Sequence, residues 1–181
     1  MEIYFLDRSV EKLAWMKRYF KDTSVNFVCQ DLEDFLRNNQ VECVVSPANA
    51  FGLMDGGLDY YITKYFGEQL QERVQKYIIK NFYGEQPVGT SFIIQANDAG
   101  QKLIHTPSMQ VPKEIKDPFV VYQCMRSTLI CAKKNKVKSA PKSFFFVLYK
   151  GKGMENIKSV ERLFREKPRS VLVDKPSDVR A

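Results

Sequence analysis

Residues 41–62 read VECVVSPANAFGLMDGGLDYYI, and this stretch decides the fold. Val41–Val45 is apolar almost throughout, which is typical of a parallel strand covered on both faces. A helical pattern runs from Asp59 to about Asn81, with an apolar residue at every fourth position. The loop Ser46–Leu58 joins the two. A buried strand, a loop and a long helix in this order predict a β-α unit of a parallel sheet.

The flanking segments extend the same alternation of strands and helices. Ser9 is a plausible N-cap for the first helix, because serine at that position accepts a hydrogen bond from the first turn. We therefore expect an α/β protein of three layers, with helices on both faces of a mixed, mostly parallel sheet. The further strands are expected at Met1–Asp7, Val25–Cys29, Ser91–Ala96, Lys102–Thr106 and Phe144–Tyr149, and the further helices at Val10–Lys21, Asp31–Asn38 and Phe119–Ala132.

Composition favours one folded domain. The chain has 181 residues, of which 44% are hydrophobic, and no apolar run approaches the roughly 20 residues that cross a bilayer. The N-terminus resembles a strand rather than a signal peptide, so we expect a cytoplasmic protein. His105 is the sole histidine, and no two cysteines form a CxxC pair, so we expect no metal and no cofactor. We expect all four cysteines to be reduced thiols packed in the core.

The net positive charge of the chain comes from its last quarter. Residues 133–181 hold 14 Lys and Arg against 5 Asp and Glu, whereas residues 1–132 hold 14 against 16. We expect residues 1–150 to form the domain and residues 151–181 a basic extension, a helix followed by a disordered tail. Such an extension is compatible with a nucleic-acid-binding face, and equally with a solvated tail.

Several side chains around the loop after the central strand can carry chemistry. Ligands bind at the carboxyl ends of strands in such sheets, and a helix N-terminus attracts anions. Gly56 and Gly57 let a phosphate or ribose approach the backbone, or merely make a tight turn. Asn49 offers an amide to a sugar or a water. Asp31 and Asp59 could each be a helix cap or dipole partner when taken alone, but grouped on one sheet edge they indicate a site.

These residues resemble the signature of the macro domain family, which binds ADP-ribose. The family has Asn-Ala-Ala-Asn after an apolar strand, then Gly-Gly, Val-Asp and a helix, and here Ser46–Asn49 and Gly56–Asp59 stand in those places. Gln30–Leu32 is similar to the family's Gly-Asp-Ile, and Leu103–Pro107 to its Ile-Ile-His strand. The likeness covers about residues 1–132. The Ser-Pro-Ala-Asn form looks like a bacterial and phage-associated branch.

The resemblance implies a role for each matching residue. Asp31 would accept from the adenine amino group, beside the backbone of Leu32. Asn49 would contact and orient the distal ribose, and Asp59 would position or activate a water. His105 would be a structural strand residue. The remaining ligand-binding positions implied by the resemblance are Ser46, Phe51, Met54, Gly56 and Gly57, of which Phe51 and Met54 would form the wall of the ribose pocket or simply pack the loop.

Two departures from the family pattern stand out. Ser46 replaces the first Asn and shortens a polar arm near the ribose. A second glycine-rich loop of Gly-Thr-Gly type is expected after the last strand pair, and Gly151-Lys152-Gly153 is a weak substitute.

The function implied is ADP-ribose binding, with hydrolysis of ADP-ribose from a modified macromolecule or metabolite as the activity of an ADP-ribosyl hydrolase. The alternatives are a non-catalytic reader of ADP-ribose or a related nucleotide, and a degenerate copy with a nucleic-acid-binding tail.

Overall fold

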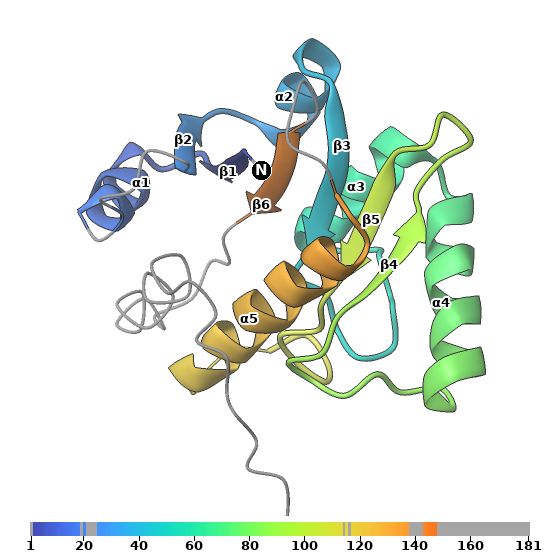
Figure 1. Ribbon diagram of the computed structural model, residues 1–181. Helices are drawn as coiled ribbons and strands as arrows, with labels where there is room; N and C mark the ends of the chain where they lie inside the picture. The colour runs from blue at the N-terminus through green and yellow to red at the C-terminus, as the bar shows by residue number, and fades with distance from the viewer. Residues whose placement is uncertain are drawn as a thin grey trace, which may run out of the picture.

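The protein is a three-layer α/β/α fold built on one six-stranded sheet (Figure 1). The computed structural model describes residues 2–18, 20, 25–113, 115 and 117–137, together with the backbone of residues 143–147. Within these residues, no helix has both the length and the apolar character required to span a bilayer. The elements run in the order β1 (Ile3–Asp7), α1 (Val10–Lys17), β2 (Val25–Cys29), α2 (Leu32–Asn38), β3 (Val41–Ser46), α3 (Gly57–Phe66), α4 (Gln69–Phe82), β4 (Phe92–Gln95), β5 (Lys102–His105), α5 (Pro118–Lys134) and β6 (Ser143–Val147).

The sheet has the strand order β2-β1-β6-β3-β5-β4. All neighbouring pairs are parallel except β4 and β5, which form an antiparallel hairpin. The prediction of a mixed, mostly parallel sheet is therefore confirmed. β6 lies between β1 and β3, with Ile3 opposite Phe144 on one side and Val44 opposite Phe145 on the other. The last strand among the described residues is thus central in the sheet.

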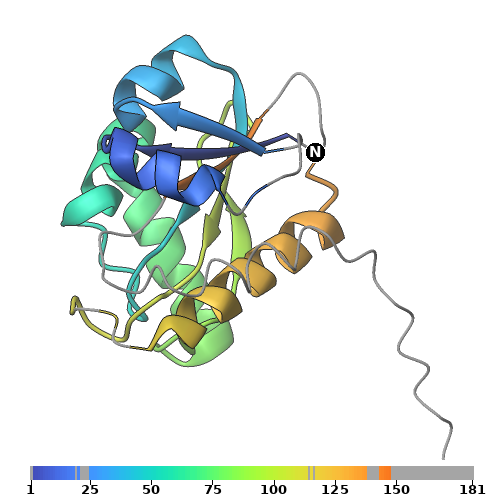
Figure 2. The same ribbon diagram turned by 90° about the vertical axis from the view of Figure 1, so that its left-hand side faces the viewer.

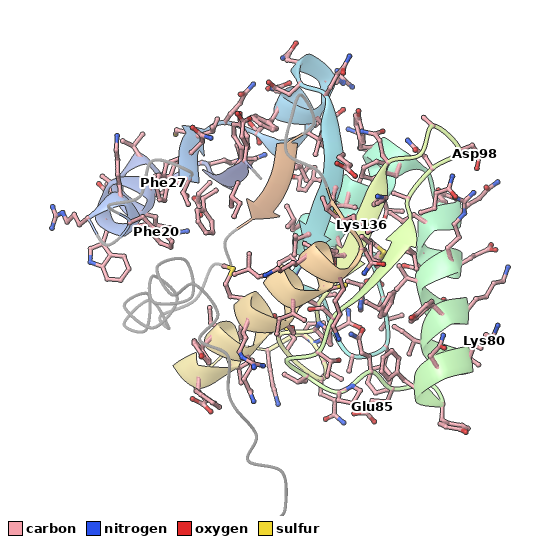
Figure 3. All side chains as sticks on the ribbon, in the orientation of Figure 1. Phe20, Phe27, Lys80, Glu85, Asp98 and Lys136 are labelled. Atoms are coloured by element: carbon pink, nitrogen blue, oxygen red, sulfur yellow. The ribbon has the colours of Figure 1, made fainter. Side chains whose placement is uncertain are left out.

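Two hydrophobic clusters fill the two faces of the sheet. Because side chains alternate along a strand, Phe5 packs on one face while its neighbour Leu6 packs on the other. The first cluster joins the sheet to α1 and α5, and Figure 3 labels two of its aromatic residues, Phe20 and Phe27, whose ring centroids are 5.7 Å apart. The second cluster joins the sheet to α2, α3 and α4. Figure 1 shows α5 crossing in front of the sheet, and Figure 2 brings α1 and β1 to the front.

The long helix expected from Asp59 to Asn81 is two helices. α3 ends at Phe66, and Gly67 has a φ of +96°, a conformation that glycine adopts without steric cost. α4 begins at Gln69. The apolar spacing continues across the break because both helices bury the same face in the second cluster. The prediction of one continuous helix is therefore wrong, although its buried positions are correct.

The first helix begins as predicted, since the hydroxyl of Ser9 accepts from the backbone N–H of Lys12 at 3.2 Å. It ends at Lys17 rather than Lys21. The predicted helix and tail of residues 151–181, and the Gly151-Lys152-Gly153 segment, lie outside the described residues.

Candidate functional site

A cleft of about 940 Å³ lies at the carboxyl edge of the parallel strands. Its wall consists of the segments that follow β1, β2 and β3, the first turn of α3, and Met109, Pro112 and Lys113 from the segment after β5. This edge is where ligands bind in open α/β sheets. The volume falls in the range of roughly 300–1,000 Å³ that is usual for small-molecule sites.

The loop after β3 is fixed because it continues to pair with the segment after β5. The backbone N–H of Ala48 donates to the carbonyl of Thr106 at 3.0 Å, and that of Ser108 donates to the carbonyl of Ala48 at 2.9 Å. Asn49 and Met109 then form a parallel bridge. The first residues of the loop are therefore held as firmly as a strand.

The side chain of Asn49 organises the next turn of the loop. Its Oδ1 accepts from the backbone N–H groups of Phe51 at 3.1 Å and Leu53 at 3.2 Å, and its Nδ2 donates to the carbonyl of Leu53 at 2.7 Å. Asn49 is 6% exposed and lines the cleft. One amide thus closes a turn and leaves its second N–H for a ligand.

The middle of the loop packs tightly against α4. Gly52 has a φ of +66°, and a Cβ atom there would lie 2.6 Å from Cγ1 of Val74 and 2.9 Å from Cδ1 of Ile78. Met54 is 1% exposed in the second core cluster, and its backbone N–H donates to Oε1 of Gln71 at 2.7 Å. The loop is therefore anchored to the core before it returns to the cleft.

Gly56 and Gly57 present bare backbone to the cleft. Gly56 is the N-cap of α3 and Gly57 its first residue, with a φ of +58°. A Cβ atom at either position would meet nothing within 4 Å, so neither glycine is required by crowding. The first N–H groups of a helix have no partner within the helix and carry the positive end of its dipole. The start of α3 is therefore suited to an anionic group.

Asp59 is a buried carboxyl group at the wall of the cleft. It is the third residue of α3 and is 7% exposed. The hydroxyl of Ser46, at the end of β3, donates to its Oδ1 at 2.5 Å. Burial raises the pKa of Asp59 to about 7; the hydrogen bond from Ser46 acts in the opposite direction, and the charge of Asp55 adds to the rise. This carboxyl therefore changes charge near neutral pH.

Asp31 lines the cleft in the segment between β2 and α2. It is the N-cap residue of α2, but its side chain makes no cap hydrogen bond. Its Oδ1 instead accepts from the guanidinium of Arg8 in the turn after β1. The same guanidinium lies over the ring of Tyr61, with its carbon 5.8 Å from the ring centroid. Leu32, next to Asp31, is buried and also lines the cleft.

The profile of the macro domain family matches residues 45–142, more than half of the chain. The chain belongs to the macro domain family. Among solved structures, the macrodomain of Mycobacterium tuberculosis DarG resembles it at 16% identity and a TM-score of 0.55, over 75% of this chain and 83% of that one. The Trypanosoma brucei macrodomain in complex with ADP-ribose resembles it at 21% identity and a TM-score of 0.52, over 69% and 51%. These likenesses show the macro-domain fold. No curated protein matches the chain.

The residues predicted for the site of this macro domain divide into two groups. The first group lines the cleft and comprises Asp31, Leu32, Asn49, Gly56, Gly57 and Asp59. The second group is not part of the cleft wall among the described residues and comprises Ser46, Phe51 and Met54. Ser46 is fully buried and meets the cleft only through Asp59. Met54 packs in the core, in line with the alternative that these apolar residues pack the loop, and a contact of Phe51 with the ribose stays a prediction.

The cysteines differ in part from the expectation that all four pack in the core. Cys43 and Cys131 are buried free thiols, as predicted. Cys124 is only partly buried, and Cys29 is exposed because it ends β2 at the sheet edge, where its thiol donates to the carbonyl of Arg8. Among the described residues, no group of His, Cys, Asp and Glu is placed to hold a metal ion.

Sequence reasoning missed several residues of the cleft, and the two whose side chains contact each other beside Asp31 are Arg8 and Tyr61. Both side chains are exposed, and neither was given a role from the sequence. Arg8 follows a predicted strand end, and this was the one available signal, because side chains just past parallel strand ends converge on the same edge. The contact of Arg8 with Asp31 joins residues 23 positions apart and could not be derived from local spacing.

Proposed function

We propose that this macro domain binds ADP-ribose in the cleft at the carboxyl edge of its sheet. The observation that carries the proposal is that Asp31, Asn49, Gly57 and Asp59 line one cleft although they come from three different segments. The Trypanosoma brucei macrodomain, which shares the fold, is described in complex with ADP-ribose. The cleft here offers the carboxylate of Asp31, bare backbone at the start of α3, and the amide of Asn49 beside the carboxyl of Asp59.

In this proposal the parts of the ligand meet groups of matching chemistry. Asp31 has Oδ1 paired with Arg8, so Oδ2 is left to accept from the adenine amino group. The diphosphate lies at the start of α3, where Gly56 and Gly57 allow close approach and the helix dipole favours negative charge. The distal ribose then lies against Asn49 and Asp59.

We further propose that the macro domain hydrolyses ADP-ribose from a modified macromolecule or metabolite. Asp59 in its ionised form takes a proton from a water as the water oxygen bonds to the anomeric or ester carbon. The bond from that carbon to the attached group breaks, and its electron pair leaves with that group, which gains a proton from the solvent. Asn49 holds the ribose so that the water and the carbon are aligned.

Calorimetric titration with ADP-ribose tests the binding proposal. We expect binding by the natural chain and a loss of at least about tenfold in affinity, or about 1.4 kcal/mol, for Asp31→Ala and Gly57→Glu. Gly57→Glu places a negative side chain where the diphosphate lies. No heat at millimolar ADP-ribose would contradict the proposal. That result would favour a degenerate copy or a protein that binds nucleic acid through its basic tail.

Two matched controls separate ligand contacts from folding effects. Asp98, an exposed carboxylate at the turn between β4 and β5, is labelled in Figure 3 and lies outside the cleft. Gly100, in the same turn, has a φ of +85° and open space around a Cβ atom, as Gly57 has. Asp98→Ala and Gly100→Glu should bind ADP-ribose as the natural chain does. Binding without turnover on ADP-ribosylated protein would identify a reader rather than a hydrolase.

A further inference from the structure

Beneath the cleft, two polar side chains form a buried pair. Ser46 ends β3 and is 0% exposed, and Asp59 lies in the first turn of α3 and is 7% exposed. The hydroxyl of Ser46 donates to Oδ1 of Asp59. The pair joins a strand of the sheet to the helix whose start faces the cleft. A polar pair at such a depth is costly unless its members satisfy one another.

Ser46 is held rigidly by the sheet. Its carbonyl accepts from the backbone N–H of Thr106 at 3.0 Å, and it lies opposite His105 in the register of β3 and β5. A serine side chain has one torsion angle and one hydroxyl proton, and here that proton is directed to Asp59. The position of Oδ1 is therefore fixed by the strand rather than by the more distant parts of α3.

The surroundings of Asp59 act on its ionisation in opposite directions. Burial and the nearby carboxylate of Asp55 both oppose ionisation, and Ser46 favours it. The N-terminal end of α3 also favours a negative charge. Of the other charged groups that line the cleft, Arg8 pairs with Asp31, Lys12 with Asp7, and Glu33 with Arg37 and Lys64. Asp34 on α2 and Lys113 on the segment after β5 also line it.

We propose that Ser46 is a positioning residue for Asp59, holding Oδ1 through its hydroxyl so that Oδ2 is aimed at a water in the cleft. This inference rests on the proposed hydrolase function for its effect on turnover, but the pairing itself can be tested without any ligand. Ser46 does not touch the ligand, and so it differs from the direct ribose contact expected from the sequence. Loss of the hydroxyl should leave the carboxyl harder to ionise and less well oriented.

Carboxyl-carbon NMR titration of the full chain tests the pairing directly, with the Asp59 signal assigned by its loss in Asp59→Asn. In Ser46→Ala we expect the pKa of Asp59 to rise by about one unit or more, because hydrogen bonds to charged groups contribute about 1.5–3 kcal/mol. Ser46→Thr keeps the hydroxyl and should restore the natural value. If Ser46→Ala does not fold, Ser46→Cys, whose thiol is a weak donor, should give a smaller rise.

Ser108 supplies the matched control. It is also a buried serine, 6% exposed, but its hydroxyl donates to the carbonyl of Pro47 rather than to a carboxylate. Ser108→Ala should leave the pKa of Asp59 unchanged. An unchanged pKa in Ser46→Ala, or an equal rise in Ser108→Ala, would overturn the proposal.

Turnover on ADP-ribosylated protein supplies the second readout. In Ser46→Ala the rising limb of kcat against pH should move to higher pH, with KM unchanged, and Ser46→Thr should move it back. If no chain shows turnover, the hydrolase function fails while the titration still decides whether Ser46 sets the state of Asp59. If turnover is present but the rising limb of kcat against pH does not move in Ser46→Ala, the positioning role of Ser46 is contradicted and the hydrolase function is not.

Discussion

Two buried titratable side chains, Asp59 and His105, are tied to neighbouring positions of the sheet but have different surroundings. Ser46 and His105 face each other in the register of β3 and β5. Ser46 binds the carboxyl of Asp59, whereas Nδ1 of His105 lies 2.7 Å from Oε1 of Gln86. Each titratable group therefore has one polar side-chain partner. Asp59 lines the cleft, and His105, fully buried and stacked on the ring of Phe92, does not.

The two groups show that a perturbed pKa does not by itself mark a functional residue. Burial raises the pKa of Asp59 to about 7 and lowers that of His105 to about 3. Both shifts favour the neutral form, as expected for any ionisable group taken out of water. Only contact with the cleft distinguishes them. His105 is therefore the structural strand residue that the sequence predicted, and Asp59 is the candidate for chemistry.

The largest difference should appear in turnover. Asp59→Asn removes the proposed general base, and we expect kcat to fall by about a hundredfold or more, the usual contribution of such a group. ADP-ribose affinity should change little. His105→Gln should retain kcat within a few-fold when measured on folded protein at a temperature well below its Tm. Equal losses of kcat in Asp59→Asn and His105→Gln would contradict the assignment of chemistry to Asp59 and of a structural role to His105.

A second effect should appear in the pH dependence of the free energy of unfolding, and it should have opposite signs for Asp59 and His105. Asp59 has a folded pKa above its unfolded value, so its contribution is present below about pH 4 and is lost as the pH rises through about 7. His105 has a folded pKa below its unfolded value, so its contribution is present above about pH 6.5 and is lost as the pH falls towards 3.

Denaturant unfolding between pH 4 and pH 8 measures both effects. Relative to the natural chain, Asp59→Asn should gain stability as the pH rises, by roughly a few kcal/mol, and His105→Gln should gain it as the pH falls. If the free energy of unfolding changes with pH equally in the natural chain and in Asp59→Asn, the carboxyl of Asp59 does not titrate near neutral pH.

Local sequence patterns predicted most of the elements but not their breaks or their order. The apolar positions of α3 and α4 were correct, because four-residue spacing reports the buried face directly. The same spacing hid the end of α3 at Gly67, since both helices bury the same face. The segment of β6 was recognised as a strand, but its central place between β1 and β3 depends on pairing with residues more than a hundred positions away.

The site was predictable to the extent that its residues lie next to strand ends. Asn49 and Gly57 follow β3, and Asp31 follows β2, so the topology of a parallel sheet brings them together. Whether Met54 lines the pocket or packs the loop was left open by the sequence, because the outcome depends on the contact of the loop with α4. The pairing of Arg8 with Asp31 likewise arises only when β1 and β2 lie side by side.

The most direct measurement is a backbone amide NMR spectrum of the full chain titrated with ADP-ribose. We expect the signals of Leu32, Asn49, Gly56 and Gly57 to shift together along one binding curve, while Gly100 in the distant β4–β5 turn stays in place. Shifts confined to residues outside the cleft, or a spectrum unchanged at millimolar ADP-ribose, would contradict binding of the ligand at the carboxyl edge of the sheet.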